Sequence, residues 1–396
     1  MKNFLSIAGL FAILLLSNRW LTFEQGMSEL KATDTRHYMA LATSFPNQHV
    51  EDIPFHQAQR FAAPMLVGAV SSVTGISHST GFLLLTLALC LTIIFLTNQV
   101  LSEVRLAPQA RFLCMALLIL NPYTFRFYLA VPAMVCDLVF ISGMTLLALG
   151  LLRGDFRLVW LAVVTASLGR QTALLAIPGA ALWMGLGESW ASRPLLKRLL
   201  FSASCLVTAS LIYIGTAKFA AASGNGGNNL QWLFGMADWL RGDPNLHTLM
   251  ELFARALIPL AFPLALIVGV GAGLGQNPIR RKEAWICLFL VASLLSQPFM
   301  GDPRIFMGNM NRYSAQTFVF ALLPLAFLLA DRPQIFKTPD SIITGLLLAC
   351  ITAASFHHMY TFIGGTSENA TRFVLIYFAL ATFSGVLVFS SSRTST

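Results

Sequence analysis

The sequence has few charged residues, which make up only 11% of its 396 positions. Soluble globular proteins carry about 25% charged residues, so this scarcity excludes a soluble globular protein. Intrinsic disorder is excluded as well, because 56% of the residues are hydrophobic and the chain contains 31 Phe. The class that remains is an all-α polytopic membrane protein, in which the backbone polar groups are satisfied inside helices.

The sequence also lacks paired cysteines and the motifs of metal sites. None of its six cysteines belongs to a C-x-x-C pair, and all six lie in apolar runs. Such cysteines are typical of buried thiols, and with no zinc motif present we expect no metal ligands. The net charge of +9 does not indicate a nucleic-acid partner, because the Lys and Arg residues of a membrane protein concentrate in its cytoplasmic loops and set its orientation.

Apolar runs of about 20 residues predict membrane-spanning helices. Residues 4–16 form the first run, and we expect this helix to be retained because no A-x-A-like cleavage site follows it. Residues 158–169 and 171–187 predict a hairpin of two short helices with Arg170 at or near its outer tip. Further spans are predicted at about 80–100, 111–129, 137–152, 199–217, 256–275, 284–300, 313–330, 341–360 and 372–391. The whole chain, residues 1–396, is therefore expected to form one transmembrane domain of about 12 membrane segments.

The distribution of charge predicts the orientation of these segments. With the N-terminus in the cytoplasm, the cytoplasmic loops contain 14 of the 26 basic residues but only six of the 17 acidic residues. These loops are short, and each contains Lys or Arg, as the positive-inside rule requires. We therefore expect both termini in the cytoplasm.

Two long polar segments, residues 17–60 and 218–255, are predicted on the outer face. The apolar run at 61–74 is too short to span, so residues 17–79 are expected to form an outer loop that carries juxtamembrane helices. Residues 218–255 form the second outer loop. Long ordered loops of this kind commonly carry function, which places the candidate chemistry on the outer face.

Asp34 lies at the start of a helix predicted over residues 35–43. Asp accepts hydrogen bonds from the free N–H groups of a helix start, so capping alone could explain this residue. Its carboxylate could also take a proton from a hydroxyl nucleophile at the membrane surface. The polar residues that share its outer segment include His37, Tyr38, His56 and Arg60.

Arg170 interrupts an apolar stretch that runs from Leu158 to Gly187. A charge at membrane depth is costly unless it is paired or faces a cavity. Asp137 is the candidate partner within the protein, and a bound phosphate is the candidate ligand. The sequence leaves both partners open.

Several short motifs follow one another in a characteristic order over about residues 1–330. They are Asp34, Tyr38 and Ala42, then Pro54, Phe55, Arg60, Phe61 and Pro64, then Asn121-Pro122 with Asp137, then residues 168–171 with Pro178, and finally Asn311-Arg312-Tyr313 with Pro324. In this order and on these sides of the membrane, the motifs resemble the GT-C superfamily of integral membrane glycosyltransferases. This superfamily includes protein mannosyltransferases and the aminoarabinose transferases of lipid A.

The resemblance implies a GT-C-like helix bundle in a bacterial inner membrane, with the active site facing the periplasm. It implies transfer of a sugar, with inversion, from a polyprenyl-phosphate donor to a hydroxyl of a glycan, lipid or protein acceptor, and no cofactor besides the donor. The catalytic carboxylates are then Asp34 and Asp137. Arginine suits the donor phosphate because its guanidinium binds phosphate bidentately. The expected substrate-binding residues are His37, Tyr38, Arg60, Arg170, Arg304, Arg312 and Tyr313.

Two departures from the family pattern bear on the mechanism. Relatives often have Arg-Glu where this chain has Arg170-Gln171, so a second carboxylate is absent there. The first outer loop contains no Asp-x-Asp, which weakens a metal-dependent mechanism and leaves the metal requirement open.

Three other functions stay open. A polymerase or ligase of polyprenyl-linked glycans would concentrate Arg and His in a late outer loop, whereas here the longer outer segment follows the first span. A transporter or flippase of a lipid-linked or anionic solute would show paired repeats, but the hairpin at 157–187 has no counterpart in the other half. A purely structural membrane subunit would not need Arg170.

Overall fold

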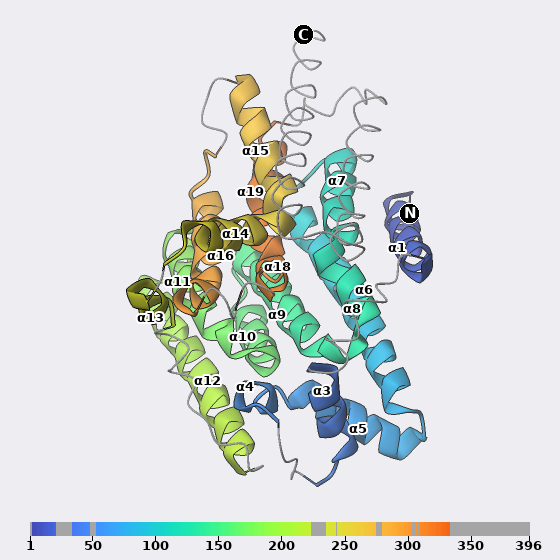
Figure 1. The fold of residues 1–396 in the computed structure, drawn as a ribbon. Coiled ribbons are helices and arrows are strands. Elements are labelled where there is room, and N and C mark those ends of the chain that lie inside the picture. The colour runs from blue at the N-terminus through green and yellow to red at the C-terminus, as the bar shows by residue number, and fades with distance from the viewer. Residues whose placement is uncertain are drawn as a thin grey trace.

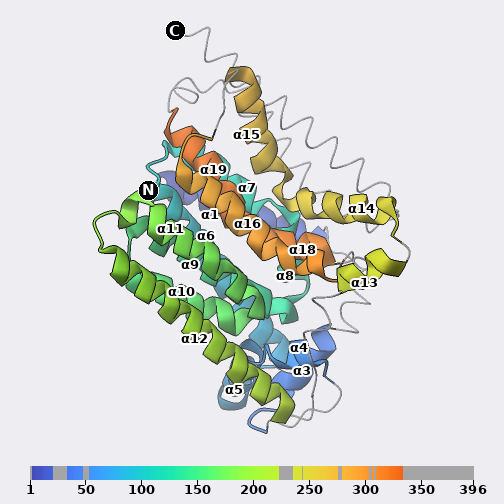
Figure 2. The ribbon, with the colours of Figure 1, turned by 90° about the vertical axis from the view of Figure 1, so that its left-hand side faces the viewer.

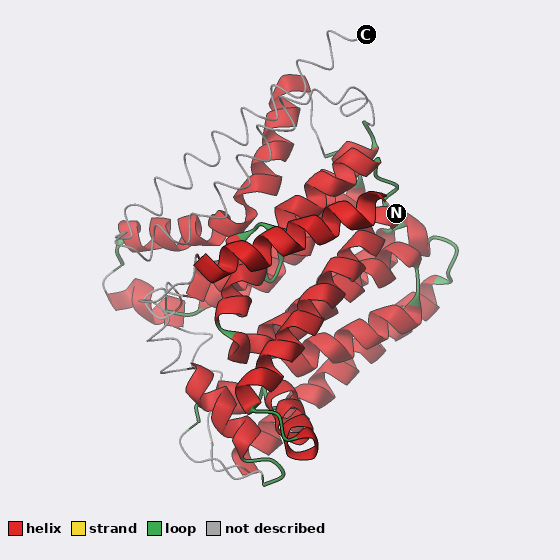
Figure 3. Cartoon of the chain, turned by 90° about the vertical axis from the view of Figure 1, so that its right-hand side faces the viewer, coloured by secondary structure: helices red, strands yellow, loops and turns green. Residues whose placement is uncertain are grey.

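The computed structural model describes part of the chain, and that part is helical, with no strand (Figures 1 and 3). The described residues are 2–20, 34–47, 53–222, 235–242, 244–274, 279–302, 306 and 309–332. The all-α class predicted from the sequence is therefore confirmed for these residues.

Long helices and short juxtamembrane helices follow one another along the chain. They are α1 (Lys2–Trp20), α3 (Arg36–Thr43), α4 (Phe55–Ala58), α5 (Ala62–Thr74), α6 (His78–Glu103), α7 (Pro108–Ile119), α8 (Phe127–Ala130), α9 (Val135–Arg153), α10 (Phe156–Gly169), α11 (Ile177–Leu186), α12 (Leu195–Ala222), α13 (Gly235–Gly242), α14 (Leu246–Leu257), α15 (Ala261–Leu274), α16 (Lys282–Met300), α18 (Met310–Ala315) and α19 (Phe318–Ala330). Short 3₁₀ or π turns join them at η2 (Pro122–Arg126), η3 (Pro132–Met134), η4 (Gln171–Ala176), η5 (Glu188–Trp190) and η7 (Ile258–Leu260).

Several of these helices can cross a membrane, which confirms a multi-pass membrane protein. The helical stretches in the described part that are long and apolar enough are His78–Glu103, Pro132–Arg153, Leu195–Ala222, Leu246–Gly269 and Lys282–Met300. A sixth candidate is the pair Pro108–Ile119 and Tyr123–Ala130, which is bent by 49°. The count of 12 segments stays a prediction, and its last two spans, 341–360 and 372–391, lie outside the described residues.

The segment predicted as the first outer loop forms short helices in its described residues. α3, α4 and α5 lie together at one end of the bundle (Figure 1). α5 has 13 residues and is therefore about 20 Å long, which is less than the thickness of a bilayer core. In the second predicted outer loop the described residues form the short helices α13 and α14, and α14 turns away from the direction of α15 (Figure 2).

α9 and α10 form a tightly packed antiparallel pair, and small residues allow the close approach. Gly154 turns the chain between them in the left-handed conformation, with φ 63°. A Cβ atom on Gly143 would lie 2.5 Å from the backbone nitrogen of Ala166, and one on Gly169 would lie 2.5 Å from the backbone nitrogen of Phe140. Small residues of this kind let helix backbones approach in membranes. The pairing brings the end of α10 beside the start of α9.

Ion pairs and hydrogen bonds join different loops to one another at the end of the bundle that the sequence assigns to the cytoplasm. Arg153 pairs with Glu103 at 2.7 Å, and the side chain of Glu283 accepts a hydrogen bond of 2.9 Å from the backbone of Glu188. Arg281, just before α16, pairs with Asp331, just after α19. Loops that the charge pattern places on one side thus contact one another, while the side of the membrane they face stays a prediction.

Candidate functional site

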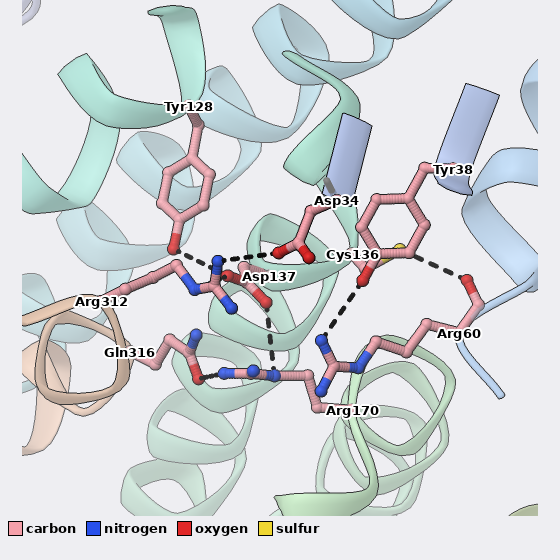
Figure 4. A network of polar contacts seen from close by, with 9 residues as sticks. All are labelled: Asp34, Tyr38, Arg60, Tyr128, Cys136, Asp137, Arg170, Arg312 and Gln316. Carbon is pink, nitrogen blue, oxygen red and sulfur yellow. Dashed lines mark hydrogen bonds and ion pairs between the residues drawn. The ribbon is translucent and has the colours of Figure 1, made fainter. Parts of the chain in front are cut away.

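A buried carboxylate, Asp137, lies at the centre of a polar cluster at the start of α9 (Figure 4). Its side chain is 2% exposed. Its Oδ1 lies 3.3 Å from Nε of Arg170, and its Oδ2 lies 3.1 Å from Nε of Arg312. The Tyr128 hydroxyl donates to Oδ2 at 3.4 Å. One carboxylate therefore joins two arginines from distant parts of the sequence.

Asp34 is the more accessible carboxylate of the cluster, with 18% of its side chain exposed. Its Oδ2 accepts a hydrogen bond of 3.2 Å from Nη1 of Arg312, and its Oδ1 accepts one from Nε2 of Gln57. The N-cap of α3 is Thr35, whose side chain makes no capping hydrogen bond, and both oxygens of Asp34 accept from other side chains. Capping therefore does not account for Asp34, and the interpretation of this residue as a simple helix cap is wrong.

Arg60, between α4 and α5, connects α3 and α9 to the cluster. Its Nη1 donates to the hydroxyl of Tyr38 on α3 at 3.3 Å, and its carbonyl oxygen accepts from Sγ of Cys136 on α9 at 3.3 Å. Burial raises the pKa of Tyr38 well above its usual range, although the nearby Arg60 opposes this shift. The phenol therefore stays protonated at neutral pH.

Arg170 lies at the end of α10, and the protein encloses it completely. Its Nη1 donates to Oε1 of Gln316 at 2.5 Å, and its guanidinium lies over the ring of Tyr313, 4.5 Å from the ring centre. Short helices precede and follow it, as predicted, and Arg170 lies buried where they join. That this junction faces the outer side stays a prediction. The ion pair of Arg170 with Asp137 and the stacking on Tyr313 explain why a charge is tolerated at this depth.

The cluster contains more positive than negative charge. Three buried arginines, Arg60, Arg170 and Arg312, face two carboxylates, Asp34 and Asp137. In the described part of the chain, Nε of Arg60 and Nη2 of Arg170 are buried without a hydrogen-bond partner. A buried charge without compensation is costly, so the arrangement is suited to binding one further negative charge.

Most of the residues predicted for a site come together in this cluster. They are Asp34, Tyr38, Arg60, Asp137, Arg170, Arg312 and Tyr313. His37 lies on α3, but within the described residues it makes no hydrogen bond or ion pair with the cluster. Arg304 lies outside the described residues.

Sequence reasoning missed four members of the cluster: Gln57, Tyr128, Cys136 and Gln316. Gln316 follows Arg312 by four residues, and spacing of this kind could have suggested a shared helical face. Gln57 lies within the motif that runs from Pro54 to Pro64, but the residue type at position 57 is not part of that motif. The sequence does not show which charged or polar group a neutral polar side chain will contact in the fold.

Comparison with known proteins found no matching family model, no matching curated sequence and no matching solved structure. The resemblance to GT-C transferases therefore rests on the order of the motifs in the sequence. Among the described residues, no group of three or more His, Cys, Asp or Glu is placed to hold a metal ion.

His56, on α4, borders the cluster and is expected to make folding sensitive to acid. Burial and the nearby Arg60 lower the pKa of His56 to about 3, and the charges of Arg170 and Arg312 act in the same direction while Asp34 opposes them. In the unfolded chain, His56 takes up a proton below about pH 6.5, whereas in the folded chain it does so only near pH 3. The free energy of unfolding therefore falls as the pH falls from about 6.5 towards 3.

The measurement is the stability of the detergent-solubilised protein between pH 7 and pH 4. His56→Gln removes the titrating group and is expected to flatten the decline by up to about 1.4 kcal/mol per pH unit. His247→Gln, at an exposed position of α14, is the matched control. An equal decline in the wild type and in His56→Gln would contradict this prediction.

Proposed function

We propose that the protein is a membrane glycosyltransferase, which moves a sugar from a polyprenyl-phosphate donor to an acceptor hydroxyl at the outer face of the membrane. The observation that carries the proposal is a partly exposed carboxylate, Asp34, held against a buried cluster with one excess positive charge. The carboxylate can act as a base, and the positively charged cluster beside it can bind an anion.

The excess charge fits the phosphate of the donor. A sugar linked to a polyprenyl phosphate is a phosphodiester with one negative charge, which equals the excess of the three arginines over the two carboxylates. Guanidinium groups bind phosphate oxygens bidentately and keep their charge at all physiological pH values. Arg60 and Arg170 contribute the buried N–H groups that lack partners in the described part of the cluster.

Asp34 is proposed as the base because it is the carboxylate that solvent reaches. One of its oxygens takes the proton of the acceptor hydroxyl, and the acceptor oxygen forms a bond to the anomeric carbon. The bond between that carbon and the phosphate oxygen breaks, and polyprenyl phosphate leaves as the anion that the arginines stabilise. A single displacement of this kind inverts the anomeric centre.

Asp137 is assigned a positioning role instead of a catalytic one. It is 2% exposed, and two guanidinium groups and the Tyr128 hydroxyl surround its oxygens. A carboxylate in this setting is a poor base, because its negative charge is already stabilised. Its contribution is to hold Arg170 and Arg312 at the places where the donor phosphate binds.

Arg312 connects the two proposed roles. It contacts Asp34 and Asp137 at the same time, with distances of 3.2 and 3.1 Å. A donor phosphate that binds Arg312 competes with Asp34 for its guanidinium. Donor binding thus weakens the ion pair of Asp34 and leaves its carboxylate available to the acceptor hydroxyl.

Arg170→Lys is expected to weaken binding of the donor by roughly tenfold to a hundredfold. Lysine keeps the positive charge, but it loses the second N–H group of the fork, and a hydrogen bond to a charged group contributes about 1.5–3 kcal/mol. The measurement is titration of the purified protein with a polyprenyl-phosphate sugar, with neutral polyprenol as the reference ligand.

The control for this titration is Arg153→Lys, since Arg153 lies at the opposite end of the bundle and pairs with Glu103. We expect donor binding to be unchanged in this variant. Equal donor affinity of the wild type and Arg170→Lys would argue against the phosphate role of Arg170.

A transporter of a lipid-linked anion is the second candidate, and the bend of 49° between Pro108–Ile119 and Tyr123–Ala130 favours it. Interrupted helices are typical of transporter binding sites. In proteoliposomes, a transferase releases free polyprenyl phosphate together with a glycosylated acceptor. A transporter delivers the intact donor to the other leaflet, so analysis of the lipid products separates the two functions.

A further inference from the structure

A second group of cations lies at the end of the bundle opposite the Asp137 cluster. Arg157, Arg193 and Lys197 are exposed at the starts of α10 and α12. No carboxylate of the described residues lies within ion-pair distance of any of the three. We call Arg157, Arg193 and Lys197 the basic patch.

Other charged residues in the same loops already have structural partners. Arg153 pairs with Glu103, and Arg198 donates to the carbonyl oxygens of Met184 and Gly185 at the end of α11. Asp155 caps α10 by accepting from two backbone N–H groups. The patch therefore keeps three positive charges that no carboxylate of the described residues neutralises.

An aromatic ring holds two of these charges together. The ammonium of Lys197 and the guanidinium of Arg193 lie 5.3 and 5.7 Å from the centre of the Phe156 ring. Edge contacts with Trp190 and Phe201, with ring centres 4.8 and 4.6 Å away, fix the orientation of that ring. Contact with a ring face attracts a cation but does not cancel its charge, so the patch remains able to bind an anion.

The surface beside the basic patch is apolar. The first turns of α12 expose four leucines, Leu195, Leu196, Leu199 and Leu200, each by 55% or more. Only four of the 28 residues of α12 are buried inside the protein, as expected for a helix that faces lipid. A ligand that satisfies both surfaces has an anionic head and an apolar tail.

We propose that the basic patch and the leucines of α12 form a binding site for an anionic phospholipid of the membrane leaflet at that end of the bundle. The phosphate of the lipid binds Arg193 and Lys197, Arg157 adds to the local positive potential, and an acyl chain lies along the exposed leucines. An acidic peptide or a nucleic acid would satisfy the cations but would leave the leucines without an apolar partner.

The test is lipid binding by the purified full-length protein in a zwitterionic detergent. Phosphatidylglycerol, phosphatidylcholine with the same acyl chains, and inorganic phosphate are titrated, and bound lipid is counted by native mass spectrometry. We expect binding of phosphatidylglycerol in preference to phosphatidylcholine, and no effect of inorganic phosphate. The double variant Arg193→Gln with Lys197→Gln is expected to weaken phosphatidylglycerol binding about tenfold or more.

Lys218→Gln is the matched control, because Lys218 is an exposed cation near the other end of the same helix. The single variant Arg193→Lys, which keeps the charge, is expected to retain most of the binding.

Equal affinity for the two lipids, or equal loss in Lys218→Gln and in the double variant, would overturn the proposal. Binding that inorganic phosphate displaces fully would also overturn it, because the acyl chain would then contribute nothing. Sugar transfer does not enter the readout, so the result is independent of the proposed function.

Discussion

Asp34→Asn is expected to lower the rate of sugar transfer by about 10²-fold or more, which is within the range for loss of a general base. Asparagine has nearly the same shape as aspartate, and its carbonyl oxygen can still accept the hydrogen bond from Gln57. It cannot take the proton of an acceptor hydroxyl. The measurement is transfer from a polyprenyl-phosphate sugar to the acceptor in isolated membranes.

The same variant should fold normally, and the geometry explains why. Arg312 loses its contact with Asp34 but keeps the ion pair with Asp137 at 3.1 Å. The lost carboxylate of Asp34 is 18% exposed, whereas that of Asp137 is 2% exposed, so solvent screens much of the positive charge that this variant leaves uncompensated. The amount of protein in the membrane is therefore expected to match the wild type. Asp238→Asn is the control, because Asp238 is an exposed carboxylate of α13 that pairs with Arg241 and does not belong to the cluster. Transfer at the wild-type rate by Asp34→Asn would rule out Asp34 as the base.

The sequence predicted much of the candidate site because charged residues stand out in an apolar chain. Arg170 and Asp137 lie in stretches where a charge is costly, and a cost of this kind limits the possible partners to a few residues. Arg312 was singled out by motif order, and Arg60 both by motif order and by its place in the same predicted outer segment as Asp34. Arg312 contacts Asp34 and Asp137, Arg170 contacts Asp137, and Arg60 contacts Tyr38, so residues from four distant segments share one end of the bundle.

Other features could not be read from the sequence, for physical reasons. The alternation of apolar runs and basic loops reports which segments cross, but it does not report the bend of 49° between Pro108–Ile119 and Tyr123–Ala130. It also could not decide whether Arg170 is paired within the protein. The structure gives it Asp137 as a partner and still leaves Nη2 without one in the described residues, so an internal ion pair and a bound phosphate are compatible.

Asp137→Asn is expected to destabilise the protein by about 3–5 kcal/mol, because it leaves buried charge without compensation. The carboxylate of Asp137 is the shared partner of Arg170 and Arg312, whose side chains are 0% and 8% exposed. Without it, the excess of positive charge in the cluster rises from one to two. Denaturation of the purified protein in detergent measures the loss.

Two further variants test whether this loss comes from charge balance. Glu103→Gln breaks the ion pair with Arg153, which is 38% exposed, so we expect a loss of less than about 1 kcal/mol. The double change Asp137→Leu with Arg170→Leu removes one charge of each sign and restores the excess to one, while Arg312 keeps its contact with Asp34. This double variant is expected to be more stable than Asp137→Asn. If Asp137→Asn cost no more than Glu103→Gln, the cluster would tolerate two uncompensated charges, and the argument that its excess charge selects a monoanionic phosphate would fail.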